Sequence, residues 1–437
     1  MNKNPESQNR STDSDSPEID EGASYIGYQE ALELVYSNVP LVGIEELPLD
    51  SCTGRIAAEE VKALISNPSN DVSLKDGFAV KSQDVAVASS EQPACLKIIG
   101  SVFAGSQFEG EVTQDNAVKI CSGSPIPRGA DTVVSDEFCD EKGAEVYIRT
   151  NAEPARNILR AGEEVKAGSV VIEKGTTLLP GYLGLAAAAG INRIKVYRKP
   201  KIAVIAIGDE VVAPGGYLKQ GQLYASNLVT IRAWLISFCA TCETAVIKDD
   251  PDAIRSELLN HLTSTDCIIT SGGAWDSERD LIVKTLDELG WNKFFHRVRI
   301  GPGKGIAFGL LKGKPVLCLP GGPASNEKAF LQFALPGVLR MGGRMNHPLQ
   351  TISARLTQDI KGRHQNWTEF KDAYLSRDAD GNYLVTPYRN ISRLQGIAKA
   401  TCLICIPEGK TWLKAGEITT VQILTPTLES LPFKPTK

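Results

Sequence analysis

The sequence predicts an α/β multidomain protein with a doubly wound α/β domain, an inserted β-rich domain, a helical connector and a C-terminal β-barrel. Three observations support this prediction. The chain has 437 residues, too many for one hydrophobic core. From about residue 200, short apolar runs alternate with helically spaced apolar residues, as in parallel strands joined by helices. Short β-type runs broken by turn residues occur both before and after that stretch.

The N-terminal part predicts a tail followed by helices. Residues 1–24 are rich in Ser, Asp, Glu and Asn and have few large apolar side chains, so we expect a disordered tail. Apolar residues have helical spacing between Tyr28 and Tyr36, and Gly54–Glu59 is a second helix-like run. Helical spacing returns between Gly181 and Ala189. These runs predict a connector domain made of residues 25–62 and 155–197.

The stretch 63–154 between the two connector segments predicts the inserted β-rich domain. Its short β-type runs are separated by Gly, Pro and Asn, and include Phe78–Val80, Leu96–Ile99 and Val118–Ile120.

Residues 198–346 predict the doubly wound domain. Its four expected strands are apolar and short, as in buried parallel sheets: Ile202–Ile207, Ala245–Ile247, Cys267–Thr270 and Val316–Leu319. The expected helices between and after them are Leu228–Phe238, Pro251–Leu262, Asp280–Leu289 and Asn326–Leu335.

Residues 347–437 predict the C-terminal β-barrel, because the helical signal disappears after Gly343 and strand-like runs recur. These runs are Thr351–Ser353, Tyr383–Val385, Leu403–Ile406 and Thr420–Ile423.

Composition excludes several classes of partner. A net charge of −5 argues against non-specific nucleic-acid binding, which requires an excess of Lys and Arg. No stretch approaches the roughly 20 apolar residues of a membrane span, and the first residues do not resemble a secretion signal. We therefore expect a soluble, cytoplasmic protein without nucleic-acid or membrane partners, whose ten cysteines are reduced.

Two cysteine pairs have the internal spacing of a zinc ribbon. They are Cys239 with Cys242, and Cys402 with Cys405. The pairs are far apart in sequence, and the second lies in an apolar run, so we interpret Cys402 and Cys405 as core residues rather than zinc ligands.

The predicted functional residues follow strands of the doubly wound domain, because ligands of such domains bind at the carboxyl ends of the strands. Asp209 and Glu210 follow the first strand, and Asp249 and Asp250 follow the second. Loop carboxylates also cap backbone N–H groups, and Asp250 before Pro251 is best interpreted as such a helix cap. Several carboxylates at one edge would repel each other unless a divalent cation lay between them, and oxygen ligands suggest Mg2+.

Glycine-rich loops predict an anion site at the same edge. Ser271, Gly272 and Gly273 follow the third strand, where backbone N–H groups can converge on an anion. The next helix begins near Asp280, which could equally stabilise the helix dipole. Two more glycine- and proline-rich loops, Gly301–Gly305 and Leu319–Pro323, suit close approach of a ligand, and Lys304 supplies a positive charge. Neither loop matches a nucleotide-binding motif.

Together these residues resemble the molybdopterin molybdenumtransferases, a family that includes a domain of gephyrin. The resemblance runs from about Tyr25 to Glu417. It depends on the order of many short matches: Gly54–Glu59, Asp76–Val80, Ser122–Pro127, Gly129–Asp131, Arg160–Glu164, Gly208–Glu210, Asp249–Pro251, Ser271–Gly273, Pro302–Lys304 and Leu319–Gly321.

The resemblance implies an elongated homodimer that inserts molybdate into the dithiolene of adenylyl-molybdopterin, releases AMP and uses Mg2+. A molybdopterin adenylyltransferase and recipient molybdoenzymes are the further partners that it suggests. The implied catalytic residues are Asp76, Glu210, Asp249, Asp280 and Lys304, with Glu210, Asp249 and Asp280 at the metal. The implied binding residues are Ser122, Asp209, Ser271, Gly272, Gly273, Pro302, Gly303, Pro320, Gly321 and Ser392. Arg389 or Arg393 could contribute from the barrel.

Several departures from the family pattern leave alternatives open. Asp71–Lys75 and Ala274–Ser277 differ from the usual runs, and Gly305 and Gly322 replace a common Pro and a common Asn. A catalytically altered paralogue that binds pterin or acts as a scaffold is therefore the main alternative. An adenylyltransferase is a third hypothesis, which the matching inserted and C-terminal segments disfavour.

Overall fold

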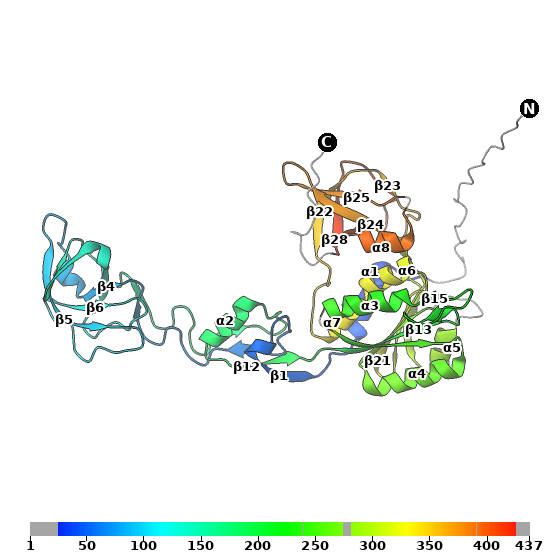
Figure 1. Cartoon of the computed structure of the whole chain (residues 1–437), viewed down its shortest axis with the longest axis horizontal. Coiled ribbons are helices and arrows are strands. Elements are labelled where there is room, and N and C mark those ends of the chain that lie inside the picture. The colour runs from blue at the N-terminus through cyan, green and yellow to red at the C-terminus, as the bar shows by residue number, and fades with distance from the viewer. Residues whose placement is uncertain (1–24, 239, 274–280, 390, 425–437) are drawn as a thin grey trace, which may run out of the picture. The chain divides into compact units, whose positions relative to one another are not determined.

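The chain forms two compact units. The computed structural model describes residues 25–238, 240–273, 281–389 and 391–424 (Figure 1). The first unit consists of residues 1–40, 200–339 and 346–437, and the second of residues 41–199 and 340–345. The predicted tail, Cys239 and the stretch 274–280, which contains Asp280, lie outside the described residues. Among the helices that are described, none has the length and apolar character needed to span a membrane.

The α/β part of the first unit is built on a six-stranded sheet in the order β16-β13-β17-β21-β20-β18. The strands are β16 (Thr241–Ile247), β13 (Lys201–Ile207), β17 (Cys267–Ser271), β21 (Lys314–Leu319), β20 (Ala307–Leu311) and β18 (Asn292–His296). The first four are parallel, and β20 and β18 are antiparallel. The four predicted strands are confirmed, but the antiparallel pair was not predicted. β16 is only partly buried because it lies at the edge of the sheet.

Helices cover both faces of this sheet, which confirms the doubly wound arrangement (Figure 1). The helices are α3 (Ser226–Ser237), α4 (Pro251–Ser264), α5 (Leu281–Glu288), α6 (Pro323–Ala329) and α7 (Leu335–Met341). A π-helical turn, Phe330–Ala334, joins α6 to α7. Ile254 and Leu258 of α4 and Ile282 and Leu286 of α5 pack with the sheet in one buried cluster.

Helix α1 (Tyr28–Asn38) confirms the first predicted helix, but it packs in the first unit rather than in the connector. The reason is its buried tyrosine. The Tyr28 hydroxyl donates to Gln332 Oε1 at 2.9 Å, and the ring makes edge contacts with Phe333 and Phe370. Apolar spacing predicted the helix but could not identify this distant partner surface.

The C-terminal part of the first unit is a closed five-stranded barrel, as predicted. Its strands in order are β24 (Thr368–Arg377), β25 (Tyr383–Pro387), β22 (Thr351–Leu356), β28 (Ile418–Ile423) and β26 (Cys402–Ile406), and a β24–β26 pairing closes the ring. Cys402 is fully buried in the barrel core, which confirms its interpretation as a packing residue. Helix α8 (Arg393–Lys399) was not predicted. A short strand from the α/β part, β19 (Ile300–Gly301), pairs in parallel with β24.

The second unit contains a six-stranded sheet in the order β7-β4-β6-β5-β9-β8. The strands are β7 (Thr132–Ser135), β4 (Gly77–Val80), β6 (Asn116–Ile120), β5 (Ala94–Val102), β9 (Glu145–Ile148) and β8 (Cys139–Lys142). The three runs predicted as strands fall in β4, β5 and β6.

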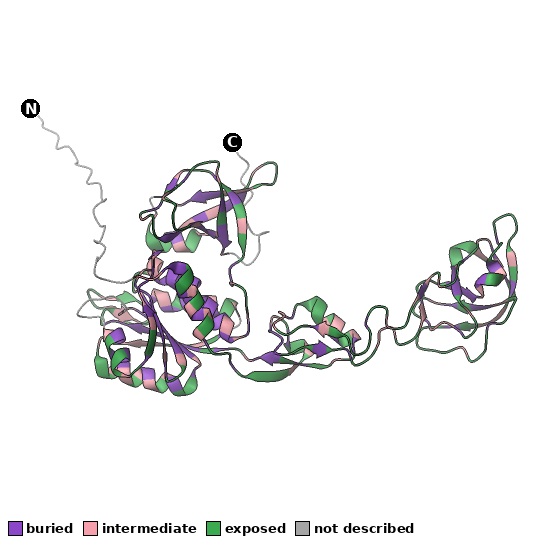
Figure 2. Cartoon of the chain, turned by 180° about the vertical axis from the view of Figure 1, so that it is seen from behind, coloured by how far each residue is buried: buried purple, intermediate pink, exposed green. Residues whose placement is uncertain are grey.

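The connector is more β-rich than predicted. Strand β1 (Ile44–Pro48) pairs with β12 (Arg193–Tyr197), and β2 (Val61–Lys62) pairs with β11 (Val170–Ile172). Its helix is α2 (Pro180–Ala188), much of which is exposed (Figure 2). The predicted helix over Gly54–Glu59 is wrong, because Ile56 and Ala57 form bridges with Thr177 and Val196 instead.

Candidate functional site

The carboxyl ends of β13, β16, β17 and β21 lie together, and we call this region the strand-end edge. The Gly208 N–H donates to the carbonyl of Ile247 at 3.1 Å, which joins the ends of β13 and β16. The Gly272 N–H donates to the carbonyl of Leu319 at 3.1 Å, which joins the ends of β17 and β21. The loops after Ile207 and Leu319, which are 112 residues apart in sequence, therefore begin at the same edge of the sheet.

Three of the predicted carboxylate residues lie at the strand-end edge. The Asp209 N–H donates to Asp249 Oδ2 at 3.4 Å. The Glu210 carboxylate folds back over Gly208, where an added Cβ would lie 2.6 Å from Glu210 Oε2. Gly208 therefore leaves the space that this carboxylate occupies. Asp280 lies outside the described residues. Among the residues that are described, no three His, Cys, Asp or Glu side chains form a group able to hold a metal.

Asp250 caps a helix, as the sequence indicated. Its Oδ1 accepts the N–H of Ala253 at 2.8 Å at the start of α4, where Pro251 occupies the first helical position.

Two asparagines hold the loops of the strand-end edge together. Asn227 Nδ2 donates to Ser271 Oγ at 3.0 Å and to the Gly321 carbonyl at 2.8 Å. Asn326 Nδ2 donates to the same Oγ at 3.0 Å and to the Pro320 carbonyl at 2.8 Å. Ser271 is 5% exposed. Its oxygen therefore fixes the two glycine loops relative to each other, a role that the sequence did not predict.

Gly272 and Gly273 form a backbone surface without side chains. Gly272 has φ +97°, and a Cβ there would lie 2.6 Å from the Ile207 carbonyl oxygen, so no other residue fits without movement. A Cβ on Gly321 would lie 3.6 Å from the Cα of Gly272. The loops after β17 and β21 thus approach each other closely at these glycines.

The Lys304 loop lies against helix α6, which begins just after the Pro320–Gly322 loop. A Cβ on Gly303, which has φ +122°, would lie 3.2 Å from the Ser325 carbonyl oxygen and 3.3 Å from the Ala329 nitrogen. Pro302 follows a cis peptide bond. Burial lowers the pKa of Lys304, and the nearby Arg297 lowers it further.

Asp76 and Ser122 lie together in the second unit. The Ser122 N–H donates to Asp76 Oδ1 at 2.7 Å, and both residues are exposed. The exposed Asp76 carboxylate thus accepts a backbone N–H from the loop that carries Ser122.

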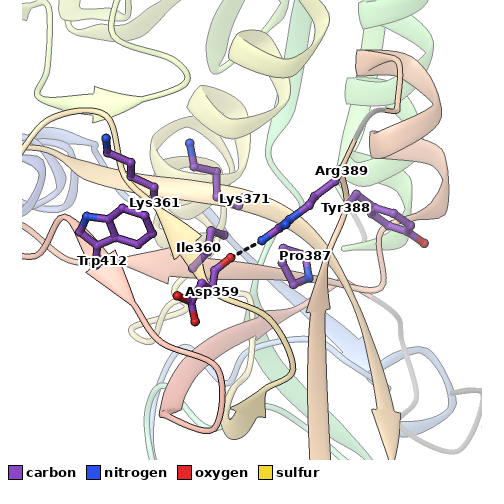
Figure 3. Close-up of a pocket in the computed structure, with 8 residues that line it drawn as sticks. All are labelled: Asp359, Ile360, Lys361, Lys371, Pro387, Tyr388, Arg389 and Trp412. Carbon is purple, nitrogen blue, oxygen red and sulfur yellow. Dashed lines mark hydrogen bonds between the residues drawn. The ribbon is translucent and has the colours of Figure 1, made fainter.

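Arg389, Ser392 and Arg393 lie in the barrel part, but they do not form one site. Ser392 caps helix α8 by accepting the Gln395 N–H at 3.3 Å, and Arg393 begins that helix. Arg389 instead lines a cavity of about 380 Å3 on the barrel, and its Nη2 donates to the carbonyl of Asp359 (Figure 3).

A buried ion cluster links helix α6 to the barrel. Lys328 is 0% exposed, and its Nζ donates to Glu327 Oε2 at 2.9 Å and to Asp372 Oδ1 at 2.5 Å. Sequence reasoning missed this cluster. The available signal was the pair of charged residues, Glu327 and Lys328, within the predicted helix Asn326–Leu335. Their partner on β24 could not be read from that pattern.

Comparison with known protein families gives three matches in order along the chain. A model described as the MoeA N-terminal region (domain I and II) matches residues 26–190. A probable molybdopterin binding domain matches residues 203–340, and the MoeA C-terminal region (domain IV) matches residues 353–424.

Individual proteins match over nearly the same extent. The molybdopterin molybdenumtransferase of Haemophilus influenzae is 31% identical over 384 residues, which cover 86% of this chain and 93% of the relative. That of Staphylococcus aureus is 30% identical over 403 residues, covering 91% and 95%. A crystal structure of a molybdopterin biosynthesis MoeA protein from Pyrococcus horikoshii has 31% identity and a TM-score of 0.79, covering 92% of this chain and 100% of the other.

Proposed function

Because the chain belongs to the molybdopterin molybdenumtransferase family, we propose that it inserts molybdate into adenylyl-molybdopterin with release of AMP, at the strand-end edge and with Mg2+. Membership makes it a transferase of molybdenum cofactor biosynthesis. The substrate, the metal and the residue roles are our proposal. The scaffolding alternative is not favoured, since curated relatives over most of the chain carry the transferase name.

The observation that supports the proposal best is the convergence of carboxylates and side-chain-free loops at one edge. The Asp209 N–H donates to the Asp249 carboxylate, a Cβ on Gly272 would meet the Ile207 carbonyl, and a Cβ on Gly321 would meet Gly272. An adenylyl-pterin carries a pyrophosphate, whose oxygens accept hydrogen bonds from backbone N–H groups at such loops. We assign Ser271, Gly272 and Gly273 to the pyrophosphate through their backbone.

The carboxylates suit a hard divalent cation. Glu210 and Asp249 supply oxygen donors, the ligand type that Mg2+ prefers, and Asp280 would complete the set. When bound, Mg2+ neutralises pyrophosphate charge and lowers the barrier to cleavage of the phosphoanhydride. Asp209 and Glu210 would then orient the water that displaces AMP.

The Lys304 loop and the Pro320–Gly321 loop would hold molybdate. Gly303 seats the first loop on helix α6, and Asn326 fixes the second through the Pro320 carbonyl. Lys304 offers one flexible cationic donor to a dianion, and its neighbours Pro302 and Gly303 leave the backbone open. Asp76, Ser122 and Ser392 are further residues to which we assign contact with substrate.

A homodimer is part of the proposal. In the second unit, Leu64, Leu179 and Tyr182 around helix α2 are 69%, 56% and 40% exposed. In the first unit, Val229 and Ile236 of helix α3 are 54% and 58% exposed. Exposed apolar groups on neighbouring turns suit burial against a second copy of the chain. Light scattering should give twice the chain mass of 47.1 kDa, and Tyr182→Glu should favour the monomer.

We also infer a cytoplasmic location, with an adenylyltransferase upstream and molybdoenzymes downstream. The nine described cysteines are free thiols, which suits a reducing compartment.

The decisive experiment measures AMP. Purified full-length chain is incubated with adenylyl-molybdopterin, molybdate and Mg2+, and AMP is quantified by chromatography. We expect turnover that stops on chelation of the metal. Asp249→Asn should lower the rate by about 100-fold, because it removes a charge that acts at the pyrophosphate. Asp280→Asn should do the same.

Asp252→Asn is the matched control. Asp252 is exposed in the first turn of α4, three residues after Asp249, so its loss should leave AMP release within about twofold of wild type. No AMP from the wild-type chain would contradict the enzyme assignment. An Asp249→Asn rate equal to that of wild type would contradict the role of the strand-end edge.

A further inference from the structure

The barrel carries a cavity that is separate from the strand-end edge. It has a volume of about 380 Å3 and is lined by Asp359, Ile360, Lys361, Lys371, Pro387, Tyr388, Arg389 and Trp412. We call it the barrel cavity. Figure 3 shows Lys361 and Lys371 extending in the same direction, with Trp412 beside Lys361 and Arg389 reaching across from the far side. All of these residues belong to the barrel part of the first unit.

The barrel cavity is positively charged, although the whole chain is acidic. Lys371 Nζ lies 2.6 Å from Glu369 Oε2, and Lys414 Nζ lies 3.0 Å from Asp359 Oδ2, so these two lysines are balanced by carboxylates. Among the described residues, neither Lys361 nor Arg389 has a carboxylate within ion-pair distance. The local excess of two positive charges contrasts with a net charge of −5 for the chain. A dianionic group would be attracted to this cavity.

One wall of the barrel cavity is an exposed aromatic ring. Trp412 is 46% exposed, whereas Trp367 elsewhere in the barrel is 7% exposed. The Lys361 and Lys414 ammonium groups lie over the Trp412 ring, 5.5 and 4.5 Å from its centroid, so a bound ring would share this indole with the two cations. The ring and Lys361 are held together because Lys361 and Trp412 are paired residues of β23 (Ile360–Lys361) and β27 (Trp412–Leu413). An exposed indole beside cations is the combination that binds a planar base and its phosphate.

The size of the cavity selects among anions. About 380 Å3 lies within the range of small-molecule sites, roughly 300 to 1,000 Å3. An inorganic oxyanion could contact the lysines but would leave the tryptophan wall uncovered. A heterocycle with one phosphate can cover the ring and still reach Lys361 and Arg389.

We propose that the barrel cavity binds a phosphate monoester of a planar heterocycle, with the ring against Trp412 and the phosphate between Lys361 and Arg389. Nucleoside monophosphates and phosphorylated pterins share this chemistry. The inference depends on barrel residues alone and does not require AMP release at the strand-end edge, so either proposal can fail without the other.

The test uses the tryptophan as a local reporter. The full-length chain is labelled with 5-fluorotryptophan and gives up to five 19F signals. Trp412→Phe identifies the signal of Trp412 by its disappearance. AMP is then titrated, with adenosine and inorganic phosphate as separate arms at constant ionic strength. We expect AMP to shift the Trp412 signal saturably, and each fragment to bind at least about tenfold more weakly, since each keeps only one of the two interactions.

Lys361→Gln should weaken the AMP response by at least about fivefold, because a charge-assisted contact is lost. Arg377→Gln is the matched control. Arg377 lies on the same barrel over the Tyr383 ring, 4.9 Å from its centroid, and outside the cavity. It should leave the AMP response unchanged. The remaining tryptophan signals check that each variant is folded.

Three results would overturn the proposal. The Trp412 signal could fail to respond to AMP, whether or not another signal moves. Inorganic phosphate could bind as tightly as AMP, which would make the cavity an oxyanion site. Lys361→Gln and Arg377→Gln could weaken AMP equally, which would indicate a general charge effect. If AMP binds, a parallel titration with a phosphorylated pterin shows which of the two binds more tightly and so identifies the source of the ligand.

Discussion

The strand-end edge and the barrel cavity both suit anionic ligands, but backbone atoms form the first surface and side chains form the second. At the strand-end edge the backbone forms the surface, and buried amides hold it, as Asn326 holds Ser271 and Pro320. In the barrel cavity, long side chains such as Lys361 and Arg389 form the surface, and both are exposed. Substitutions at the strand-end edge should therefore reduce stability and function together, whereas those at the barrel cavity should change ligand affinity with little effect on folding.

The largest change in the free energy of unfolding is expected at Lys328, which links helix α6 to the barrel. Lys328→Met would leave the buried Glu327 and the partly buried Asp372 without their cation, and breaking a buried pair in this way costs about 3–5 kcal/mol. Lys410→Met removes an exposed pair with Glu417 and should cost at most about 1 kcal/mol. Urea unfolding of both variants measures the difference. Equal losses would show that the buried cluster does not join the two regions strongly.

The next effect tests the backbone surface of the edge. Gly272→Ala should destabilise the chain by about 1–3 kcal/mol more than Gly409→Ala. Both glycines have a positive φ, +97° and +92°, but only Gly272 has an atom within 4 Å of its added Cβ. The pair therefore separates steric contact from backbone preference. Thermal unfolding provides the measurement, and similar melting temperatures for the two variants would contradict the close approach of Ile207.

A smaller effect concerns acid stability beside the barrel cavity. Burial raises the pKa of Glu369, but Lys371 and the N–H groups of Arg363 and His364 lower it more, so the folded pKa lies below its usual value. Its stabilisation is therefore present above the unfolded pKa, about 4.3, and is lost as the pH falls through the folded pKa. Glu369→Gln should lower the melting temperature at pH 7, and the deficit should shrink towards pH 3. A deficit that is independent of pH would contradict this assignment.

The smallest effect is expected at the rim of the cavity. Lys414→Gln removes an ion pair with Asp359 in which both side chains are exposed, so the free energy of unfolding should change by less than about 1 kcal/mol. The change should disappear at about 1 M salt, where the screening length is roughly 3 Å. A loss of stability that persists at high salt would mean that the cavity wall stabilises the fold, which would contradict the expectation that cavity substitutions have little effect on folding.

The sequence predicted those elements whose side chains show a simple pattern because each face of the element is either buried or exposed throughout. Strand β13 is a continuous apolar run because both its faces are buried, and it was found within one residue of its start. Strand β24 was missed because Thr368–Arg377 mixes charged and apolar residues: Lys371 points to the cavity, and Asp372 pairs with Lys328. The helix expected over Gly54–Glu59 was wrong because bridges to Thr177 and Val196, over a hundred residues away, outweighed local spacing.

The candidate site likewise has a part that the sequence predicted and a part that it did not. Positions after strand ends predicted that Asp209 and Asp249 come together, because topology alone brings them to one edge. The amide contacts of Asn227 and Asn326 were not predicted, since an asparagine in a first helical turn has many possible partners. The pairing of Lys361 with Trp412 depends on strand register, which a single sequence does not reveal.

The pairing of strand β19 limits how this protein can be divided into fragments. Although it belongs to the α/β segment of the chain, its hydrogen-bonding partner is β24, through Ile300 with Thr368. The lysine-bearing turn that follows is thereby anchored in the neighbouring barrel. A fragment that ended before residue 347 would leave this strand edge unsatisfied and its turn unanchored. The two parts are therefore poor candidates for exchange as modules, and a chimaera should carry them over as a matched pair.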